Sequence, residues 1–197
     1  MPHRPGMRPL EEQVREALDA GITMLQLREK YLSEEDFLRE ALSIRKLTER
    51  YHVPLIINDS LYVAINSGAD GIHIGQSDLP AREVRAKLGP DKILGVTAKT
   101  VAQALEAEKA GADYLGSGAV FPSPTKTDAI PMSRETLTAI CQSVSIPVVA
   151  IGGINASNLS TLAGTGIAGA AIISGIFGQP DIGAAVRELR ECIHKNH

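Results

Sequence analysis

The chain has 197 residues and a net charge of −3, with 44% hydrophobic and 22% charged residues, which are ordinary values for one globular domain. The negative charge and the absence of tryptophan argue against nucleic acid as a partner. No apolar run reaches about 18 residues and the first residues lack a signal-peptide core, so we expect no membrane association and a cytoplasmic location.

One pattern recurs along the chain: a helical segment ends at a glycine, and an apolar run follows within a few residues. Glycine after a helix adopts the left-handed conformation, and a wholly apolar run is typical of a parallel strand covered on both faces. The pattern predicts strands near 24–28, 54–58, 71–75, 93–97, 114–119, 147–152 and 169–174. Helices are predicted at 9–19, from the N-cap Ser33 to about 50, from Asp78-Leu-Pro80 onward, at 101–110 and at 181–194.

Alternating strands and helices predict βαβ units and a single α/β domain over residues 1–197, of the TIM-type (β/α)8 barrel class. Seven strands are visible, so the first strand of such a barrel is apparently lacking in this chain. An open barrel would leave two unpaired edges. We therefore expect the domain to be N-terminally short, with the true N-terminus upstream of Met1; the alternatives are that the barrel is open or that a neighbouring molecule completes it.

Three polar residues alternate at the end of the first predicted strand: Gln26, Arg28 and Lys30. Alternate residues of a strand share one face, so the amide and the two cations point to the same side, while Leu25 and Leu27 point toward packed helices. Grouped cations are costly without an anion. The pattern predicts half of a site for a phosphorylated ligand.

Asp59 and Asp78 follow two neighbouring predicted strands, and Asn58 precedes the first of them. Parallel strand ends meet at one face of a barrel, so the two carboxylates could share a Mg²⁺ ion, which takes one or two carboxylates together with substrate phosphate oxygens. The alternative is that each aspartate is merely a helix N-cap.

Two further segments carry phosphate-binding chemistry. Thr97 ends the fourth predicted strand, and the loop Ser123-Pro-Thr125-Lys126 after the fifth combines hydroxyls with a cation. Gly153, Ile173 and Ser174 follow the last two strands, where barrels of this class commonly bind phosphate through backbone amides. His73 has two open interpretations, as a site residue or as a satisfied core side chain. Cys141 and Cys192 are interpreted as packing residues of helices.

With these motifs in view, the chain resembles the thiamine phosphate synthase family from about Leu10 to its last helix. The resemblance rests on Gln26-Leu-Arg-Glu-Lys30, Asn58-Asp59, Gly71-Ile-His-Ile-Gly-Gln-Ser-Asp78, Gly95-Val-Thr97, the Ser123–Lys126 loop, Gly152-Gly153 and Ile173-Ser174. Thr97 and Ser123 depart from the family's commoner Ser and Thr, and both keep the hydroxyl.

The family joins 4-amino-2-methyl-5-pyrimidinylmethyl diphosphate to a thiazole phosphate and releases diphosphate. The resemblance implies a cytoplasmic, Mg²⁺-dependent transferase of thiamine biosynthesis with small-molecule substrates, and it leaves a homo-oligomeric state open. It implies that the pyrimidine diphosphate is held by Gln26, Arg28, Lys30, Asn58, Thr97 and Lys126, with Arg28, Lys30, Thr97 and Lys126 catalytic. Asp59 and Asp78 would hold Mg²⁺, and the thiazole phosphate would be held by Ser123, Thr125, Gly153, Ile173 and Ser174.

Three other functions remain open from the sequence. A related thiazole tautomerase would need a histidine at position 99, where this chain has Lys99. A non-catalytic protein that binds phosphorylated ligands would share the same strand ends. A sugar-phosphate epimerase would have less use for two aspartates among several cations. The preferred form of the thiazole phosphate and the oligomeric state are also open.

Overall fold

The computed structural model describes residues 8–122 and 131–194, and its centre is a seven-stranded parallel sheet whose strands follow one another in chain order. The strands are β1 (Leu25–Leu27), β2 (Leu55–Asn58), β3 (Gly71–Ile74), β4 (Ile93–Thr97), β5 (Tyr114–Gly118), β6 (Val148–Ile151) and β7 (Gly169–Ala171). All seven lie in predicted ranges, so the predicted α/β class is confirmed. The first and last strands are shorter than expected.

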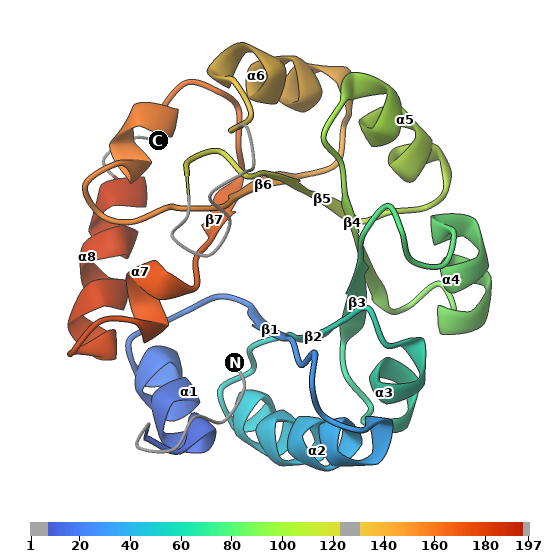
Figure 1. Cartoon of the computed structure of the whole chain (residues 1–197), viewed down its shortest axis with the longest axis vertical. Helices are drawn as coiled ribbons and strands as arrows, with labels where there is room; N and C mark the ends of the chain where they lie inside the picture. The colour runs from blue at the N-terminus through green and yellow to red at the C-terminus, as the bar shows by residue number, and fades with distance from the viewer. Residues whose placement is uncertain (1–7, 123–130, 195–197) are drawn as a thin grey trace.

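Helices form an outer ring around the arc of strands (Figure 1). They are α1 (Leu10–Asp19), α2 (Glu34–Arg50), α3 (Leu61–Asn66), α4 (Ala81–Leu88), α5 (Val101–Lys109), α6 (Arg134–Ser143), the 3-10 helix η1 (Leu159–Leu162), α7 (Ser174–Phe177) and α8 (Ile182–His194). Ser33 caps α2 by accepting a hydrogen bond from the Asp36 amide at 3.1 Å, as its sequence position predicts. Gly21 and Gly111 adopt φ of 92° after α1 and α5, which confirms the predicted glycine stops.

The sheet does not close on itself within the described residues. β1 pairs with β2 alone and β7 with β6 alone, while α1 and α8 contact each other across the gap (Figure 1). The Gly183 amide donates to the Glu16 carboxylate at 3.3 Å, which joins the two helices. The architecture is therefore TIM-like with seven strands, and the eight-stranded barrel lacking its first strand stays a prediction.

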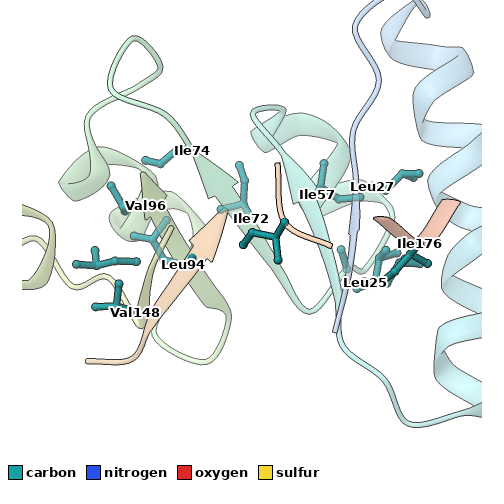
Figure 2. Packing of buried hydrophobic residues seen from close by; sticks show 14 of the residues in the cluster. Leu25, Leu27, Ile57, Ile72, Ile74, Leu94, Val96, Val148 and Ile176 are labelled. Atoms are coloured by element: carbon teal, nitrogen blue, oxygen red, sulfur yellow. The ribbon is translucent and has the colours of Figure 1, made fainter. Parts of the chain in front are cut away.

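The hydrophobic core lies between the strands and the helices. Leu25 and Leu27 are 6% and 4% exposed and belong to this core, as their alternation with Gln26 predicts. Figure 2 shows the same arrangement repeated on neighbouring strands, with buried side chains labelled at Leu25, Leu27, Ile57, Ile72, Ile74, Leu94, Val96 and Val148. The alternate positions of these strands point to the opposite, interior face, where the polar residues lie.

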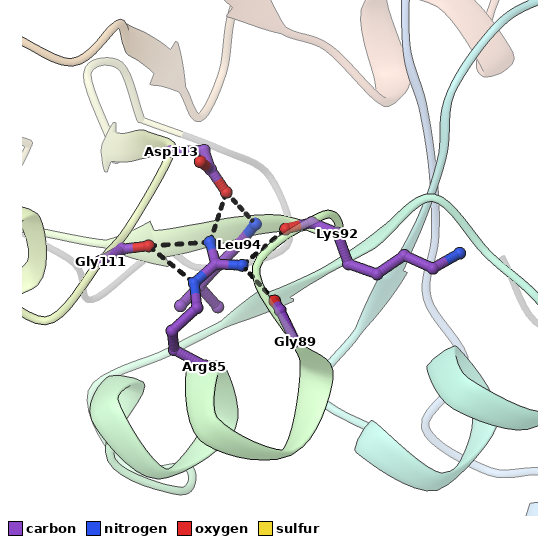
Figure 3. Close-up of polar contacts among 6 residues, drawn as sticks. All are labelled: Arg85, Gly89, Lys92, Leu94, Gly111 and Asp113. Carbon is purple, nitrogen blue, oxygen red and sulfur yellow. Dashed lines mark hydrogen bonds and ion pairs between the residues drawn. The ribbon is translucent and has the colours of Figure 1, made fainter.

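Two aspartates brace the N-terminal ends of the strands in the same way. Asp70 accepts hydrogen bonds from the Leu55 amide and the Arg45 guanidinium, both at 2.8 Å. Asp113 accepts from the Leu94 amide at 2.7 Å and from Arg85 at 2.5 Å (Figure 3). Arg85 also donates to the carbonyl oxygens of Gly89, Lys92 and Gly111. Each brace ties a helix to a strand end away from the predicted site.

None of the helices in the described part of the chain is both long enough and apolar enough to cross a membrane.

Candidate functional site

The predicted site residues on β2, β3 and β4 are brought together by the register of the sheet. Asn58 lies beside His73, and His73 lies beside Gly95, two residues before Thr97. Asn58, His73 and Thr97 therefore share the interior face near the C-terminal ends of their strands. The buried Asn58 amide donates to the His73 carbonyl oxygen at 3.3 Å and to the Asp59 carboxylate. Asn58 thus orients Asp59, a role that the sequence did not indicate.

Asp59 and Asp78 interact directly. Burial and the negative charge of Asp78 raise the pKa of Asp59, and Arg28 and Lys30 act in the opposite sense. Asp59 also has a φ of 65°, which is unusual for a residue other than glycine. Within the described residues, no third His, Cys, Asp or Glu joins the pair. Two adjacent carboxylates with cations beside them are a donor set that suits one divalent cation.

The N-cap alternative for the two aspartates is wrong. Ser60 rather than Asp59 caps α3, because its hydroxyl accepts from the Val63 amide at 3.2 Å. The Asp78 carboxylate turns back to the Gly75 amide at 2.6 Å, and α4 begins three residues later than predicted, at Ala81. A methyl group at Gly75 would lie 3.1 Å from that carboxylate, so glycine leaves the space that Asp78 uses. Both carboxylates are therefore free of helix capping.

Gln26, Arg28 and Lys30 lie at the open edge of the site. Gln26 is the exposed middle residue of β1, and Arg28 and Lys30 follow the strand with exposed side chains. Both cations act on the Asp59 carboxyl, which places them on the side of the acid pair, as predicted. Four of the predicted residues, two acids and two bases, therefore share one neighbourhood.

His73 lies in the interior and is hydrogen-bonded at both ring nitrogens. Its Nδ1 lies 2.9 Å from the Tyr114 hydroxyl and its Nε2 lies 3.0 Å from the Thr97 hydroxyl. The residue is 9% exposed, and burial lowers its pKa from 6.5 to about 4, so the ring is neutral at pH 7. Both interpretations of His73 apply. Its side chain is buried with both ring nitrogens hydrogen-bonded, and one of its partners is the predicted site residue Thr97.

Tyr114 is a site residue that the sequence analysis missed. Its ring occupies the space above Gly95, where an added methyl group would lie 2.2 Å from the ring, and the His73 ring occupies the space above Gly116. Burial raises the pKa of Tyr114, and a hydrogen bond from the Gln26 side chain lowers it by a smaller amount. The sequence could have indicated this position, because Tyr114 alternates with Gly116 and Gly118 on one face of the strand.

Gly152 and Gly153 form a tight turn after β6. Gly153 has a φ of 63°, and a side chain there would meet the Pro122 carbonyl oxygen at 2.5 Å. The Asn158 amide donates to the Gly153 carbonyl oxygen at 2.9 Å and fixes the turn. Ile173 and Ser174 are exposed, and Ser174 begins α7 rather than ending a strand, so the predicted strand to residue 174 is wrong beyond Ala171. Pairing with β6 ends at Ala171, and the chain then turns into the helix.

Ser123, Thr125 and Lys126 lie outside the described residues. Their predicted contacts with phosphate are therefore expectations from the sequence. Cys141 and Cys192 lie in α6 and α8 and are partly buried, in accord with the predicted packing role.

The seven parallel strands, with polar residues gathered at their C-terminal ends, define a TIM-like α/β fold of the class whose enzymes bind their ligands at those ends. A family model described as thiamine monophosphate synthase matches residues 2–176. The chain belongs to this family, whose members are transferases of thiamine biosynthesis, and the predicted resemblance is confirmed.

Curated relatives and solved structures agree. The chain is 53% identical to the thiamine-phosphate synthase of Ruminiclostridium cellulolyticum over 182 residues, which cover 92% of this chain and 87% of the relative. It is 48% identical to thiamine-phosphate synthase 2 of Streptococcus pneumoniae serotype 4, with the same coverage. The structure of thiamine phosphate pyrophosphorylase from Pyrococcus furiosus is 40% identical and matches with a TM-score of 0.88, over 95% of this chain and 91% of that one.

Proposed function

We propose that this chain condenses 4-amino-2-methyl-5-pyrimidinylmethyl diphosphate with a thiazole phosphate, forming thiamine phosphate and diphosphate. The observation that carries the proposal is the contact of Asp59 with Asp78 beside Arg28 and Lys30, in a chain of this family. Two acids and two bases at one set of strand ends suit a diphosphate bound together with a metal ion.

The acid pair fits Mg²⁺ in its chemistry. Magnesium prefers oxygen ligands and is usually held by one or two carboxylates plus substrate phosphate oxygens. The mutual repulsion that raises the pKa of Asp59 would be relieved by a cation between the two groups. When bound, Mg²⁺ would neutralise charge on the departing diphosphate.

The residues of the chain would do the rest by neutralising charge and by alignment. Arg28, Lys30 and Lys126 would stabilise the negative charge that grows on the diphosphate as the carbon–oxygen bond breaks and its electron pair leaves with oxygen. The electron-rich pyrimidine stabilises the resulting methylene cation, and the thiazole nitrogen then supplies the electron pair of the new carbon–nitrogen bond. Such a reaction needs no general base, which agrees with a neutral, fully hydrogen-bonded His73.

The thiazole phosphate would bind near the ends of β6 and β7. Gly153 and Ser174 lie there, with Ile173 between the strand and α7. Backbone amides and the Ser174 hydroxyl are suitable donors to phosphate oxygens. Ser123 and Thr125 would add hydroxyls from the loop that follows β5.

The test is an incubation of the purified chain with both substrates and Mg²⁺, in which thiamine phosphate and diphosphate are measured together. We expect equal amounts of the two products and loss of both on chelation of the metal. Stabilisation of the protein by either substrate without any product would instead identify a binding protein. Isomerisation of the thiazole phosphate alone would identify a tautomerase, although Lys99 occupies the position where that activity needs histidine.

A further inference from the structure

A continuous chain of hydrogen bonds crosses the interior of the sheet. It consists of Tyr114 on β5, His73 on β3 and Thr97 on β4, joined by contacts of 2.9 Å and 3.0 Å, and we call it the interior hydrogen-bond chain. Gln26 on β1 adjoins its Tyr114 end. Thr97, at the other end, is the last residue of its strand and is partly exposed toward the site.

The two rings of this chain have little freedom to move. Tyr114 and His73 are 8% and 9% exposed, and their ring centroids are 5.4 Å apart. Each ring fills the space left by a glycine on a neighbouring strand, Gly95 for Tyr114 and Gly116 for His73. It therefore matters which atom of each hydrogen bond is the donor. If two donors or two acceptors faced each other, neither ring could rotate away to avoid the mismatch.

The available donors and acceptors determine which group donates to which along the interior hydrogen-bond chain. A neutral imidazole has one N–H and one bare nitrogen, and a phenol has one O–H. The phenol is the better donor and the bare imidazole nitrogen is the better acceptor, so the Tyr114 hydroxyl donates to His73 Nδ1. The hydrogen bond that Gln26 gives to the phenolic oxygen favours the same direction. The imidazole proton then lies on Nε2 and is donated to the Thr97 oxygen.

This direction leaves the proton of the Thr97 hydroxyl without an acceptor among the residues that the structure describes. The Thr97 hydroxyl already accepts from His73, so its own proton is available to an acceptor in the site. In the opposite tautomer, Thr97 would donate inward to His73 and offer the site a lone pair instead. The tautomer of a buried histidine thus decides whether Thr97 meets a ligand as a donor or as an acceptor.

We propose that Tyr114 is a positioning residue that holds His73 in the Nε2–H tautomer and so commits the Thr97 hydroxyl to donate a hydrogen bond to the pyrimidine diphosphate substrate. The ligand named here rests on the proposed function, whereas the tautomer does not. Tyr114 acts through its hydrogen bond to His73. The substrate carries the acceptors that a committed donor needs, on its ring nitrogens and its phosphate oxygens.

The tautomer is tested by nitrogen NMR of protein labelled with ¹⁵N-histidine, and the His73 signals are assigned by their loss in His73→Gln. We expect the Nε2–H tautomer in the unmodified protein and a mixture of tautomers in Tyr114→Phe. The matched control is Tyr51→Phe, which removes a hydroxyl bonded to Asp19 on the surface and leaves the His73 signals unchanged. An Nδ1–H tautomer in the unmodified protein would overturn the proposal. This measurement does not depend on whether any variant folds.

The donor role of Thr97 is tested by calorimetric binding of the pyrimidine diphosphate, which needs no turnover. Thr97→Ser keeps the hydroxyl and is expected to bind normally, whereas Thr97→Val and Tyr114→Phe are expected to bind about tenfold more weakly. Normal binding by Thr97→Val would contradict the donor role. If the unmodified protein binds the ligand but forms no product, the proposed reaction fails while this assignment stands.

Discussion

The carboxyl group of Asp59 lies against that of Asp78 at the ends of two neighbouring strands, and this contact together with burial raises the pKa of Asp59. Proteins rarely place two acids side by side without a compensating partner. Asp59 also adopts a φ of 65°, which is uncommon for a residue other than glycine. Both features are costs to the fold that a bound metal ion and diphosphate would offset.

Asp59→Asn should strongly lower turnover while leaving the fold intact. Asparagine tolerates the left-handed conformation as well as aspartate does, so the backbone at this position is not strained further. Loss of one carboxylate ligand should lower kcat by about 10²-fold or more. Steady-state kinetics over a range of Mg²⁺ concentrations provides the measurement, and normal turnover by the variant would remove Asp59 from the site.

The same substitution should change how stability depends on pH in metal-free protein. A carboxyl group whose pKa is raised by folding binds a proton more tightly in the folded state, so its contribution to stability is lost as pH rises through that raised pKa. Urea titrations above the ordinary range of aspartate should therefore show a decline with pH that Asp59→Asn lacks. A decline of equal size in both proteins would show that the acid pair is not coupled.

His73 should give the opposite dependence. Its pKa is lowered to about 4 from 6.5 in the folded protein, so the unfolded chain binds the proton first and stability falls as pH drops from about 6.5 toward 4. Between these two pH values, the free energy of unfolding should fall by about 3 kcal/mol because of His73. His73→Gln should lose this acid sensitivity, although it will be less stable at neutral pH. The comparison requires unfolding free energies at several pH values, and an unchanged slope in the variant would contradict the assignment.

Gly95→Ala should disturb the site without touching a charged residue. The added methyl group would lie 2.2 Å from the Tyr114 ring, so the ring must move, at a cost of about 1–3 kcal/mol. Substrate affinity should fall together with stability. Gly169→Ala on β7 is the matched control, because nothing lies within 4 Å of its added methyl group. Thermal unfolding of the two variants gives the comparison, and equal stability would mean that Tyr114 packs elsewhere.

Arg85→Ala should destabilise the fold and leave the chemistry alone. The guanidinium bonds Asp113 and three carbonyl oxygens at the N-terminal ends of the strands, so its loss leaves several partners unsatisfied and should cost about 2–3 kcal/mol. Arg82→Ala on the same helix removes an exposed arginine and serves as the control. At low temperature, KM and kcat of Arg85→Ala should match those of the unmodified protein. A selective loss of kcat would instead show that the contacts of Arg85 influence the site.

Lys126→Ala should lower kcat by about 10²-fold or more, because a cation would be lost from the departing diphosphate. Lys109→Ala, on the exposed side of α5, is a suitable control. Near-normal turnover by the Lys126 variant would remove this residue from the reaction.

The sequence predicted the strands well, because each of them lies in a largely apolar run that follows the end of a helix. It also indicated which polar residues follow β2 and β3, although the pattern alone left Asp59 and Asp78 open to interpretation as helix N-caps. The ends of the edge strands were predicted less well. Ile172 and Ile173 are as apolar as strand residues, but β7 stops where its pairing with β6 stops. The sequence pattern alone does not show at which residue this pairing ends.

The interior of the site was the least predictable part. Tyr114 looks like an ordinary strand residue, and its position depends on a glycine nineteen places earlier, on a different strand. Asp78 precedes Leu-Pro as an N-cap would, yet its carboxylate turns to the Gly75 amide instead. Local patterns allow both outcomes, and the contact between strands decides which one occurs.

The most direct test of the whole account is a crystal structure of the chain with Mg²⁺ and diphosphate. We expect one metal ion between the carboxylates of Asp59 and Asp78, with diphosphate oxygens completing its ligands and Arg28 and Lys30 in contact with the same anion. Diphosphate bound at a distance from the two aspartates, or a metal ion held by other residues, would contradict it.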